Sequence, residues 1–199
     1  MIKIGITGGV GSGKSLITNY IGDNYNARVY LADDIANKIK EPGEICYRPI
    51  IDLLGEDILN DDKTIDKKAM AAKIFADPEL LKKVNGIIHP AVKTYVLNEI
   101  KRLEDDGFKG LFVLEAALLI EDNYDEILDE LWYVRVDEEI RIKRLMDSRG
   151  YSREKALSIM KKQLSDEEYR KHCKVVIDNS GSIKDTERSL QRLMEKYSG

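Results

Sequence analysis

The sequence predicts an α/β fold in which helices cover both faces of a parallel, five-stranded sheet. Three observations predict it. Short apolar segments alternate with helical segments, these apolar segments are hydrophobic at consecutive positions, and a glycine-rich turn joins the first of them to a helix. Strands that are apolar throughout, without an alternating polar face, are typical of parallel sheets that are buried on both sides. Their alternation with helices is the pattern of an α/β domain.

The expected strands are short, and each is rich in β-branched or other apolar residues. They fall at residues 2–7, 29–31, 111–114, 131–136 and 175–177. The helical spacing of Leu16, Ile17, Tyr20 and Ile21 predicts a helix soon after the first strand. Further helices are expected at residues 33–40, 138–147, 152–163 and 183–197.

A long helical stretch with few strand signals interrupts this alternation between about residues 45 and 106. We interpret it as an insertion in a single domain that spans residues 1–199. Breaks are predicted at Asp77-Pro78 and at His89-Pro90, because proline suits the first turn of a new helix. The expected parts are this insertion, a segment of about residues 138–165, and a core of residues 1–40, 107–137 and 173–199.

Composition and charge limit the possible classes of function. The chain has 199 residues, 43% hydrophobic and 34% charged, and its net charge of −4 argues against a general nucleic-acid or membrane-surface binder. Two cysteines far apart in sequence and two histidines argue against a disulfide framework or a structural zinc site. No apolar run approaches the roughly 18 residues of a membrane span, and the strand pattern that begins at Ile2 leaves no room for a signal peptide. We therefore expect a cytoplasmic protein.

The most specific motif lies between the first strand and the first helix. Residues 8–15, Gly-Gly-Val-Gly-Ser-Gly-Lys-Ser, match the phosphate-binding loop (P-loop) pattern G-x-x-x-x-G-K-[ST] without a mismatch. Glycines let backbone N–H groups turn toward a polyphosphate, and the helix that begins near Gly13 points its positive end at the same phosphates. Lys14 is expected to reach the β- and γ-phosphates, and Ser15 to coordinate Mg²⁺. A purely structural turn is the alternative, but the flanking strand and helix stand where nucleotide binding requires them.

Two acidic residues follow expected strands. Asp33 comes just after the second strand, at the sheet edge where ligands of open parallel sheets bind. Its carboxylate can accept a proton from an attacking hydroxyl or hold that hydroxyl in line, and a helix N-cap is the alternative role. Glu115 ends the third strand, where P-loop proteins often hold an acidic residue near Mg²⁺.

Two further residues leave alternatives open. Asn179 lies in the loop after the last strand, where it can read an adenine edge or simply form a turn. His89 precedes a proline, and it can contact a substrate, cap a helix or pack in the core. Spacing alone does not choose among these roles.

Positive charge is concentrated in residues 140–164. This segment has eight basic and two acidic side chains, so it holds +6 while the rest of the chain totals −10. Arg141 and Arg144 are three positions apart and share a helix face. Two basic helices joined near Gly150 are typical of the lid of a small-molecule kinase, which closes over ATP and brings guanidinium groups to the phosphates. A solvated basic helix pair is the alternative.

The order of these motifs resembles the dephospho-CoA kinase family over nearly the whole chain. Besides the P-loop with its preceding Gly5-Ile6-Thr7, the matching elements are Leu31-Ala32-Asp33, Ile74-Phe75-Ala76-Asp77-Pro78, Ile87-Ile88-His89-Pro90, Glu115–Glu121 and Val176–Gly181. The departures are Leu31 in place of an aspartate, Ala117 in place of a proline, Ile120 in place of a phenylalanine and Arg141 in place of a glutamine. Arg144 matches a lid arginine of the family, whereas either Ser148 or Arg149 takes the next arginine position.

The resemblance implies a three-layer α/β/α P-loop fold and the transfer of a phosphoryl group from ATP to the ribose 3′-hydroxyl of dephospho-CoA. The implied catalytic residues are Asp33, Lys14, Arg144 and Arg149. Those implied for ATP are Gly11, Ser12, Gly13, Lys14, Ser15, Leu16 and Asn179. The helical insertion is expected to bind the acceptor, with Asp33, His89 and Leu118 as its contacts, and Mg²⁺ is expected at Ser15 and Glu115. We expect a monomer without a nucleic-acid or membrane partner.

Two other functions remain open at this point. Another small-molecule kinase, acting on a nucleoside monophosphate or a sugar acid, keeps the P-loop and the lid but changes what the insertion recognises. A non-catalytic ATPase switch is the second alternative, and the basic lid and Asp33 fit it poorly. A GTPase is disfavoured, because Asn37-Lys38 is followed by Ile39-Lys40 and the guanine-reading N-K-x-D motif is therefore missing.

Overall fold

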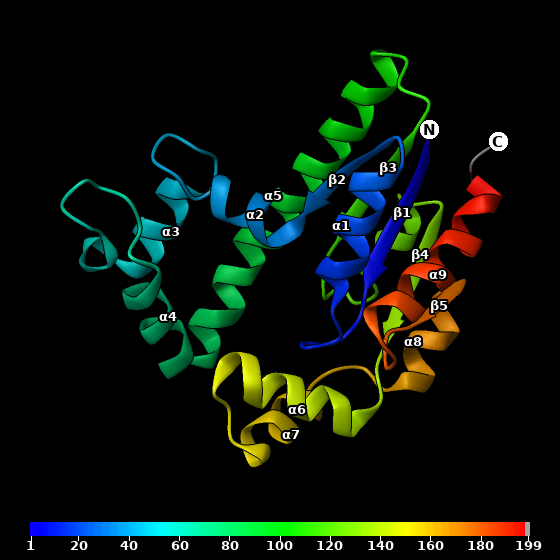
Figure 1. Ribbon diagram of the computed structural model, residues 1–199. Helices are drawn as coiled ribbons and strands as arrows, with labels where there is room; N and C mark the ends of the chain where they lie inside the picture. Colours follow the sequence, from blue (N-terminus) through cyan, green and yellow to red (C-terminus); the bar gives the residue numbers. More distant parts are fainter. Residues whose placement is uncertain (198–199) are drawn as a thin grey trace. The chain divides into compact units, whose positions relative to one another are not determined.

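The computed structural model describes residues 1–197, and its sheet has the predicted five strands (Figure 1). They are β1 (Ile2–Thr7), β2 (Ala27–Leu31), β3 (Leu111–Glu115), β4 (Glu130–Arg135) and β5 (Val175–Asp178). Their order is β2-β3-β1-β4-β5; β1 pairs in parallel with β3 and β4, and β4 pairs in parallel with β5. The predicted parallel α/β fold is confirmed. Because β3 and β4 flank β1 on opposite sides, the carboxyl end of β1 is the switch point at which ligands bind in such sheets.

The chain forms two compact units. The first comprises residues 1–30 and 109–199, and the second comprises residues 31–108. The second unit therefore begins at Leu31 and contains residues 31–40, which the sequence placed in the core, together with the predicted helical stretch. Within residues 1–197, no helix has both the length and the apolar character needed to cross a membrane.

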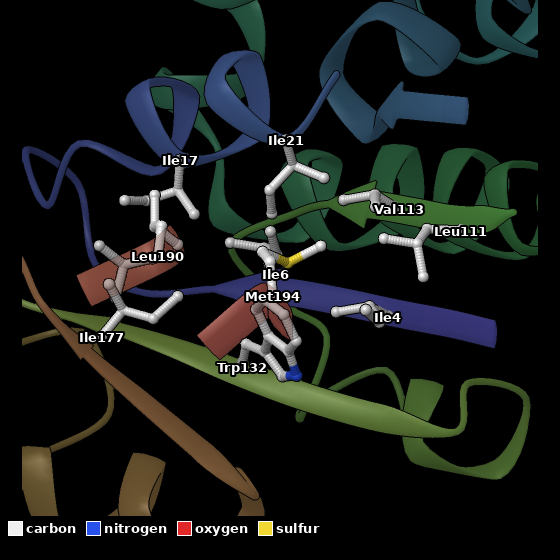
Figure 2. Close-up of a cluster of buried hydrophobic side chains, with 11 residues drawn as sticks. Ile4, Ile6, Ile17, Ile21, Leu111, Val113, Trp132, Ile177, Leu190 and Met194 are labelled. Carbon is white, nitrogen blue, oxygen red and sulfur yellow. The ribbon is translucent and has the colours of Figure 1, made fainter. Parts of the chain in front are cut away.

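The first unit buries one face of its sheet under α1 (Lys14–Asn24) and α9 (Ile183–Met194). Figure 2 shows Ile6 of β1 and Trp132 of β4 among side chains from both helices, including Ile17 and Leu190. These four side chains are fully buried. Each such side chain stabilises the fold by about 1.5–3 kcal/mol relative to an exposed one. The core thus fixes the start of α1 against the end of β1, and with it the P-loop.

The remaining helices of this unit lie in the second half of the chain. They are α6 (Glu138–Arg149), α7 (Arg153–Met160) and α8 (Asp166–His172), with short 3₁₀ turns at Tyr124–Glu126 and Glu195–Tyr197. The sequence did not predict α8, because only one of its seven side chains, Tyr169, is buried, and so it has no apolar periodicity. Tyr169 stacks on Tyr133 of β4, with 4.4 Å between the ring centroids. The missed signal was the Ser165 N-cap, followed by acidic residues in the first turn and basic residues in the last.

The second unit consists of α2 (Ala32–Lys38), α3 (Tyr47–Leu54), a 3₁₀ turn (Glu56–Ile58), α4 (Lys67–Ala76) and α5 (Pro78–Asp105). Helix α5 packs against α2, α3 and α4 and is the central element of this unit. It begins as predicted, with Asp77 as N-cap and Pro78 in its first turn.

The predicted helix break at His89-Pro90 is wrong. Helix α5 runs through Pro90 without ending, for 28 residues. A proline in a helix removes one hydrogen bond and crowds the carbonyl group four residues earlier, which here belongs to Gly86. Buried side chains on both sides of this position, among them Val84 and Val92, supply the packing that keeps the helix continuous.

Candidate active site

The P-loop joins β1 to α1, and its own lysine closes it. The Lys14 ammonium group donates to the carbonyl oxygen of Gly8 at 2.9 Å, and the Ser12 N–H donates to the carbonyl oxygen of Gly9 at 3.1 Å. Gly13, the N-cap of α1, has a φ of +84°, a left-handed conformation that strains any residue with a Cβ. No side chain in the described part of the chain caps α1, so the positive end of its helix dipole is left to attract an anion.

Asn179 braces the P-loop from the loop that follows β5. Its side-chain N–H group donates to the carbonyl oxygen of Ser12 at 2.8 Å, and its amide oxygen accepts from the Thr186 hydroxyl at 2.9 Å. The residue is only 2% exposed, and a Cβ at Gly13 would collide with its amide nitrogen. Both polar atoms of the Asn179 amide thus have a partner inside the protein, as buried polar groups need, and its contact with adenine remains a prediction.

Two arginines of α6 contact the nucleotide-binding region of this unit. Arg141 donates from Nε to the carbonyl oxygen of Val10 at 2.6 Å and from Nη2 to the side-chain oxygen of Gln163. The same Gln163 oxygen accepts from the Val10 N–H at 3.2 Å. Arg144 donates from Nη2 to the carbonyl oxygen of Asn179 at 2.8 Å. These contacts are not those of a solvated basic helix pair.

The Arg141 guanidinium group occupies a tight space beside the P-loop. A Cβ at Gly9 would collide with it, so a larger residue at this position would displace the end of the Arg141 side chain. Burial lowers the pKa of Arg141 below its ordinary value, although Tyr169, Tyr133 and Glu138 act in the opposite direction. The sequence predicted that Arg141 shares a helix face with Arg144 in the lid, whereas its contact with the P-loop is visible only in the structure.

The end of α6 contains Ser148 and Arg149, the two candidates for the next arginine position of the lid. The Ser148 hydroxyl donates to the carbonyl oxygen of Arg144, one turn earlier, at 2.6 Å. Arg149 is the last residue of α6, and its side chain is exposed. Ser148 is therefore used within the helix, whereas the Arg149 guanidinium group stays available, and its catalytic role remains a prediction.

Glu115 and Ser15 provide the oxygen ligands expected for a metal ion. Glu115 ends β3 in register with Ile6 of β1, and its carboxylate accepts from the Thr18 hydroxyl of α1 at 3.2 Å. Ser15 lies one turn before Thr18 on the same helix. Among residues 1–197, no cluster of three or more His, Cys, Asp or Glu side chains can hold a metal ion by itself. One hydroxyl and one carboxylate nevertheless suit Mg²⁺, which takes many of its ligands from phosphates and water.

Two leucines of the first unit were also predicted as substrate contacts, Leu16 for ATP and Leu118 for the acceptor. Leu16 follows Ser15 in the first turn of α1, and its N–H donates to the carbonyl oxygen of Gly13 at 3.1 Å. Leu118 follows β3 and is 41% exposed. The Thr7 hydroxyl donates to the carbonyl oxygen of Ala117 at 3.2 Å, which holds this segment beside the end of β1. Contacts of either leucine with a substrate remain predictions.

The second unit carries Asp33 and His89. Leu31, not Asp33, is the N-cap of α2, so the alternative role of Asp33 as a cap is wrong. Asp33 lies exposed in the first turn, where the helix dipole favours a carboxylate. His89 is half-buried in the interior of α5 and therefore caps no helix.

The loop after β5 is held by an arginine that sequence reasoning missed. Arg135, at the end of β4, forms ion pairs with Asp137 at 2.5 Å and with Asp178 at 2.8 Å. The Ser180 hydroxyl accepts from Arg135 at 3.3 Å and from the Asp137 N–H at 2.9 Å. An arginine at the end of a strand, followed two residues later by an aspartate, was the available signal. This network fixes the backbone from which Asn179 reaches the P-loop.

Residues 2–185 match the sequence profile of the dephospho-CoA kinase family. The chain belongs to this family. It is 38% identical over 194 residues to the dephospho-CoA kinase of Carboxydothermus hydrogenoformans, an alignment that covers 98% of this chain and 93% of that protein.

Solved structures agree with this membership. The crystal structure of TT1252 from Thermus thermophilus has a TM-score of 0.80 and 32% identity, and the alignment covers 100% of this chain and 98% of that one. The dephospho-CoA kinase from Campylobacter jejuni, with a TM-score of 0.75 and 22% identity over 98% of this chain and 96% of that one, shares the fold. The resemblance drawn from the sequence motifs is confirmed.

Proposed function

We propose that this chain carries out the reaction of its family with the P-loop holding ATP and with Asp33 acting on the acceptor. A dephospho-CoA kinase transfers the γ-phosphoryl group of ATP to the 3′-hydroxyl of the ribose in dephospho-CoA, which gives CoA and ADP. The observation that carries the function is the family match over residues 2–185, which includes an intact P-loop. The geometry of the first unit supports the nucleotide half of the proposal.

In this proposal the backbone N–H groups of the P-loop bind the phosphates of ATP, and Lys14 leaves the Gly8 carbonyl to neutralise charge on the transferring group. The contributing positions are Gly11, Ser12, Gly13, Lys14, Ser15 and Leu16. Asn179 contributes through the shape that it gives the loop. The buried Ser12 hydroxyl, which has no hydrogen-bond partner within residues 1–197, supports a ligand at this loop because phosphate oxygens are strong acceptors.

Asp33 holds the 3′-hydroxyl in line and accepts its proton as the oxygen attacks the γ-phosphorus. Exposure of its carboxylate in the first turn of α2, without a capping role, supports this use. His89 and Leu118 are proposed as further contacts of the acceptor. The second unit, as the helical stretch expected to recognise that acceptor, completes a single kinase domain together with the core and the lid.

Arg144 and Arg149 stabilise the negative charge that spreads over the phosphoryl oxygens in transfer. Arginine suits this task because its planar guanidinium group binds two oxygens at once and keeps its charge. Mg²⁺, which Ser15 and Glu115 would hold, supplies charge neutralisation to the phosphates of ATP. Catalysis therefore depends mostly on positioning and electrostatics.

We also propose that the chain acts as a monomer in the cytoplasm, with small-molecule substrates only. The net charge of −4 and the two unpaired cysteines, both buried, support this setting.

The deciding experiment measures ADP release from Mg·ATP with dephospho-CoA as the acceptor, beside AMP, CMP, adenosine and gluconate in parallel assays. We expect turnover with dephospho-CoA far above that with the others. Turnover with a different acceptor and none with dephospho-CoA would assign another small-molecule kinase. Slow ATP hydrolysis that no acceptor accelerates would favour the ATPase switch.

A further inference from the structure

Val10, the third residue of the P-loop, is held by the segment after β4 in three separate ways. Its N–H donates to the side-chain oxygen of Gln163 at 3.2 Å, and its carbonyl oxygen accepts from Nε of Arg141 at 2.6 Å. Its side chain packs against the buried apolar cluster that α6 and α7 share, which includes Ile142 and Ala156. The backbone and the side chain of Val10 are thus both fixed by α6, α7 and the residues directly after α7 (Figure 1).

The two polar partners of Val10 also bond to each other. Nη2 of Arg141 donates to the same Gln163 oxygen that accepts from the Val10 N–H. The three residues therefore form a closed ring of hydrogen bonds. Because the donors of a guanidinium group lie in one plane at fixed angles, such a ring holds its members in one geometry. A lysine side chain, with one flexible ammonium group, does not reproduce this fork.

No acidic side chain explains the position of Arg141. Within residues 1–197 its side chain forms no ion pair, and its hydrogen bonds go to Val10 and Gln163 alone. The guanidinium group is half-buried, and a buried cation without a counterion costs stability. Residues that break a local rule of stability are commonly found at functional sites, and here the only groups contacted belong to the P-loop and its support.

The hydrogen bonds of Val10 matter most when ATP is bound. In the proposed function Lys14 leaves the carbonyl oxygen of Gly8 to reach the phosphates, so the P-loop then loses one of its own hydrogen bonds. The bonds of Val10 use no group that is assigned to ATP, so they persist while Lys14 moves. Gly11, the first residue assigned to ATP, directly follows Val10 and has a φ of +82°. Its N–H group is therefore oriented by a backbone that the fixed Val10 supports.

We propose that Arg141 and Gln163 are positioning residues for phosphoryl transfer, which act by fixing Val10 and thereby aiming the N–H groups of the P-loop at the phosphates. The inference rests on the proposed function, in which this loop binds ATP. Arg141 lies near the start of α6 and Gln163 follows α7, so both ends of the lid are attached to one residue of the P-loop. This attachment also sets the position from which Arg144 meets the phosphates.

Steady-state kinetics of Arg141→Met and Arg141→Lys test the role of the fork. Methionine removes the charge and the donors, whereas lysine keeps the charge and loses the planar pair of donors. We expect both variants to lower kcat about tenfold and to raise KM for ATP about three- to tenfold, while KM for the acceptor changes less than about twofold. The matched control is Lys143→Met, an exposed neighbour on α6. Parent-like kinetics of Arg141→Lys would assign the effect to charge and overturn the proposal.

A double-mutant cycle tests whether the two residues act together. If both act through Val10, the double variant Arg141→Met with Gln163→Ala should lose no more than about twofold in kcat/KM for ATP beyond the more severe single variant. Gln163→Glu keeps an oxygen acceptor for both donors and should recover most of kcat. Lys162→Ala, at an exposed neighbouring position, is the control. Losses that multiply in the double variant would show separate actions and overturn the shared role.

Thermal unfolding separates positioning from a purely structural role. The kinetics are measured well below the melting temperature of each variant, so that every variant is folded. A structural residue would lower the melting temperature and leave kcat and KM for ATP unchanged under these conditions. That outcome for Arg141→Met would overturn the proposal.

Failure of this inference differs from failure of the function itself. Calorimetric binding of the non-hydrolysable ATP analogue AMP-PNP with Mg²⁺ needs no acceptor, and its Kd should rise about three- to tenfold in Arg141→Met. This change would support the inference even if the parent protein does not phosphorylate dephospho-CoA. If the parent protein phosphorylates dephospho-CoA and the variants keep its kinetics and its Kd, only the inference fails. If the parent protein binds no ATP, both fail.

Discussion

The P-loop of the first unit and a pocket of the second unit both present positive charge, but they hold it differently. Around the P-loop, Lys14, Arg141 and Arg144 each donate a hydrogen bond to a backbone carbonyl oxygen of the protein. In the second unit, Lys40 and Lys67 line the pocket of about 430 Å³ with no such partner among residues 1–197.

The difference teaches how each region meets its ligand. Groups that already bond to the protein are held in place, and Lys14 must give up its bond to the Gly8 carbonyl when it binds phosphate. Lys40 and Lys67 have no such bond to give up when a ligand arrives. Variants that remove one of the hydrogen-bonded groups around the P-loop should therefore lose stability together with activity, whereas variants of exposed residues in either unit should lose mainly function.

The largest effect is expected for Asp33→Asn. It removes the proton acceptor and keeps the shape, so kcat should fall by roughly 10²-fold or more while the affinity for ATP holds. Asp33 caps no helix but lies where the helix dipole favours a carboxylate, so the melting temperature should fall only slightly. The control is Asp34→Asn, an exposed neighbour in the same turn. An unchanged kcat in Asp33→Asn would remove Asp33 from the reaction.

Arg144→Ala should lose about 2–3 kcal/mol of transition-state stabilisation, measured as kcat/KM for ATP. It should also lower the melting temperature, because the Asn179 carbonyl oxygen loses its donor. Arg149→Ala should lower kcat without the thermal effect, since that side chain is exposed. Exposed Lys143, on the same helix, gives the control Lys143→Ala. A purely thermal effect of Arg144→Ala would mean that the arginine is structural.

Thr186→Val tests the hydrogen bonds by which Thr186 and Asn179 support the P-loop. It leaves the buried Asn179 amide oxygen without a donor, which should cost about 1–3 kcal/mol of unfolding free energy and raise KM for ATP. Thr186→Ser restores the hydroxyl and should recover most of both losses. Denaturant unfolding and steady-state kinetics measure the two quantities. A stability loss with unchanged KM for ATP would show that the hydrogen bond between Thr186 and Asn179 does not contribute to nucleotide binding.

The smallest effect is expected at acidic pH, for Glu130→Gln at the start of β4. Burial would raise the pKa of Glu130, but hydrogen bonds from Lys174, Tyr197 and Trp132 outweigh it and hold the pKa below its ordinary value. Stability from this carboxylate is thus complete well above the ordinary pKa of glutamate, about 4.3, and is lost as pH falls through the lowered value. Melting temperatures between about pH 5 and 3 should fall less steeply in Glu130→Gln than in the parent protein. Parallel curves would show that these partners do not support folding.

Much of the fold could be predicted, because a buried strand is visible in the sequence as a run of consecutive apolar residues. Each of the five apolar segments became a strand, and the inner strands β1, β3 and β4 are also the most buried. Helix α8 escaped because one buried tyrosine makes no periodic pattern. The break predicted at Pro90 failed because the cost of one proline is smaller than the packing of the long helix that contains it.

Some residues of the candidate site were also visible in the sequence, and others were not. The P-loop and the acidic ends of β3 and α2 were visible in the sequence, because motif spacing and strand ends are local features. Gln163, Thr186 and Arg135 were not, because each acts through a partner that is distant in sequence or through a backbone group. The hydrogen bonds of the Asn179 amide with Ser12 and Thr186 were not visible either, because the sequence of a loop does not show that a side chain points inward.

By itself, the sequence determined the chemistry of the P-loop and the family of the chain. Eight consecutive residues between a strand and a helix specify a phosphate site, because the N–H groups that bind it belong to one short segment of backbone. Only the tertiary structure decided what supports that loop, since Asn179 and Ser12 are 167 positions apart and Arg141 and Val10 are 131 apart. It also decided that Lys40 and Lys67 line one apolar pocket, because helix packing, not sequence spacing, brings such residues together.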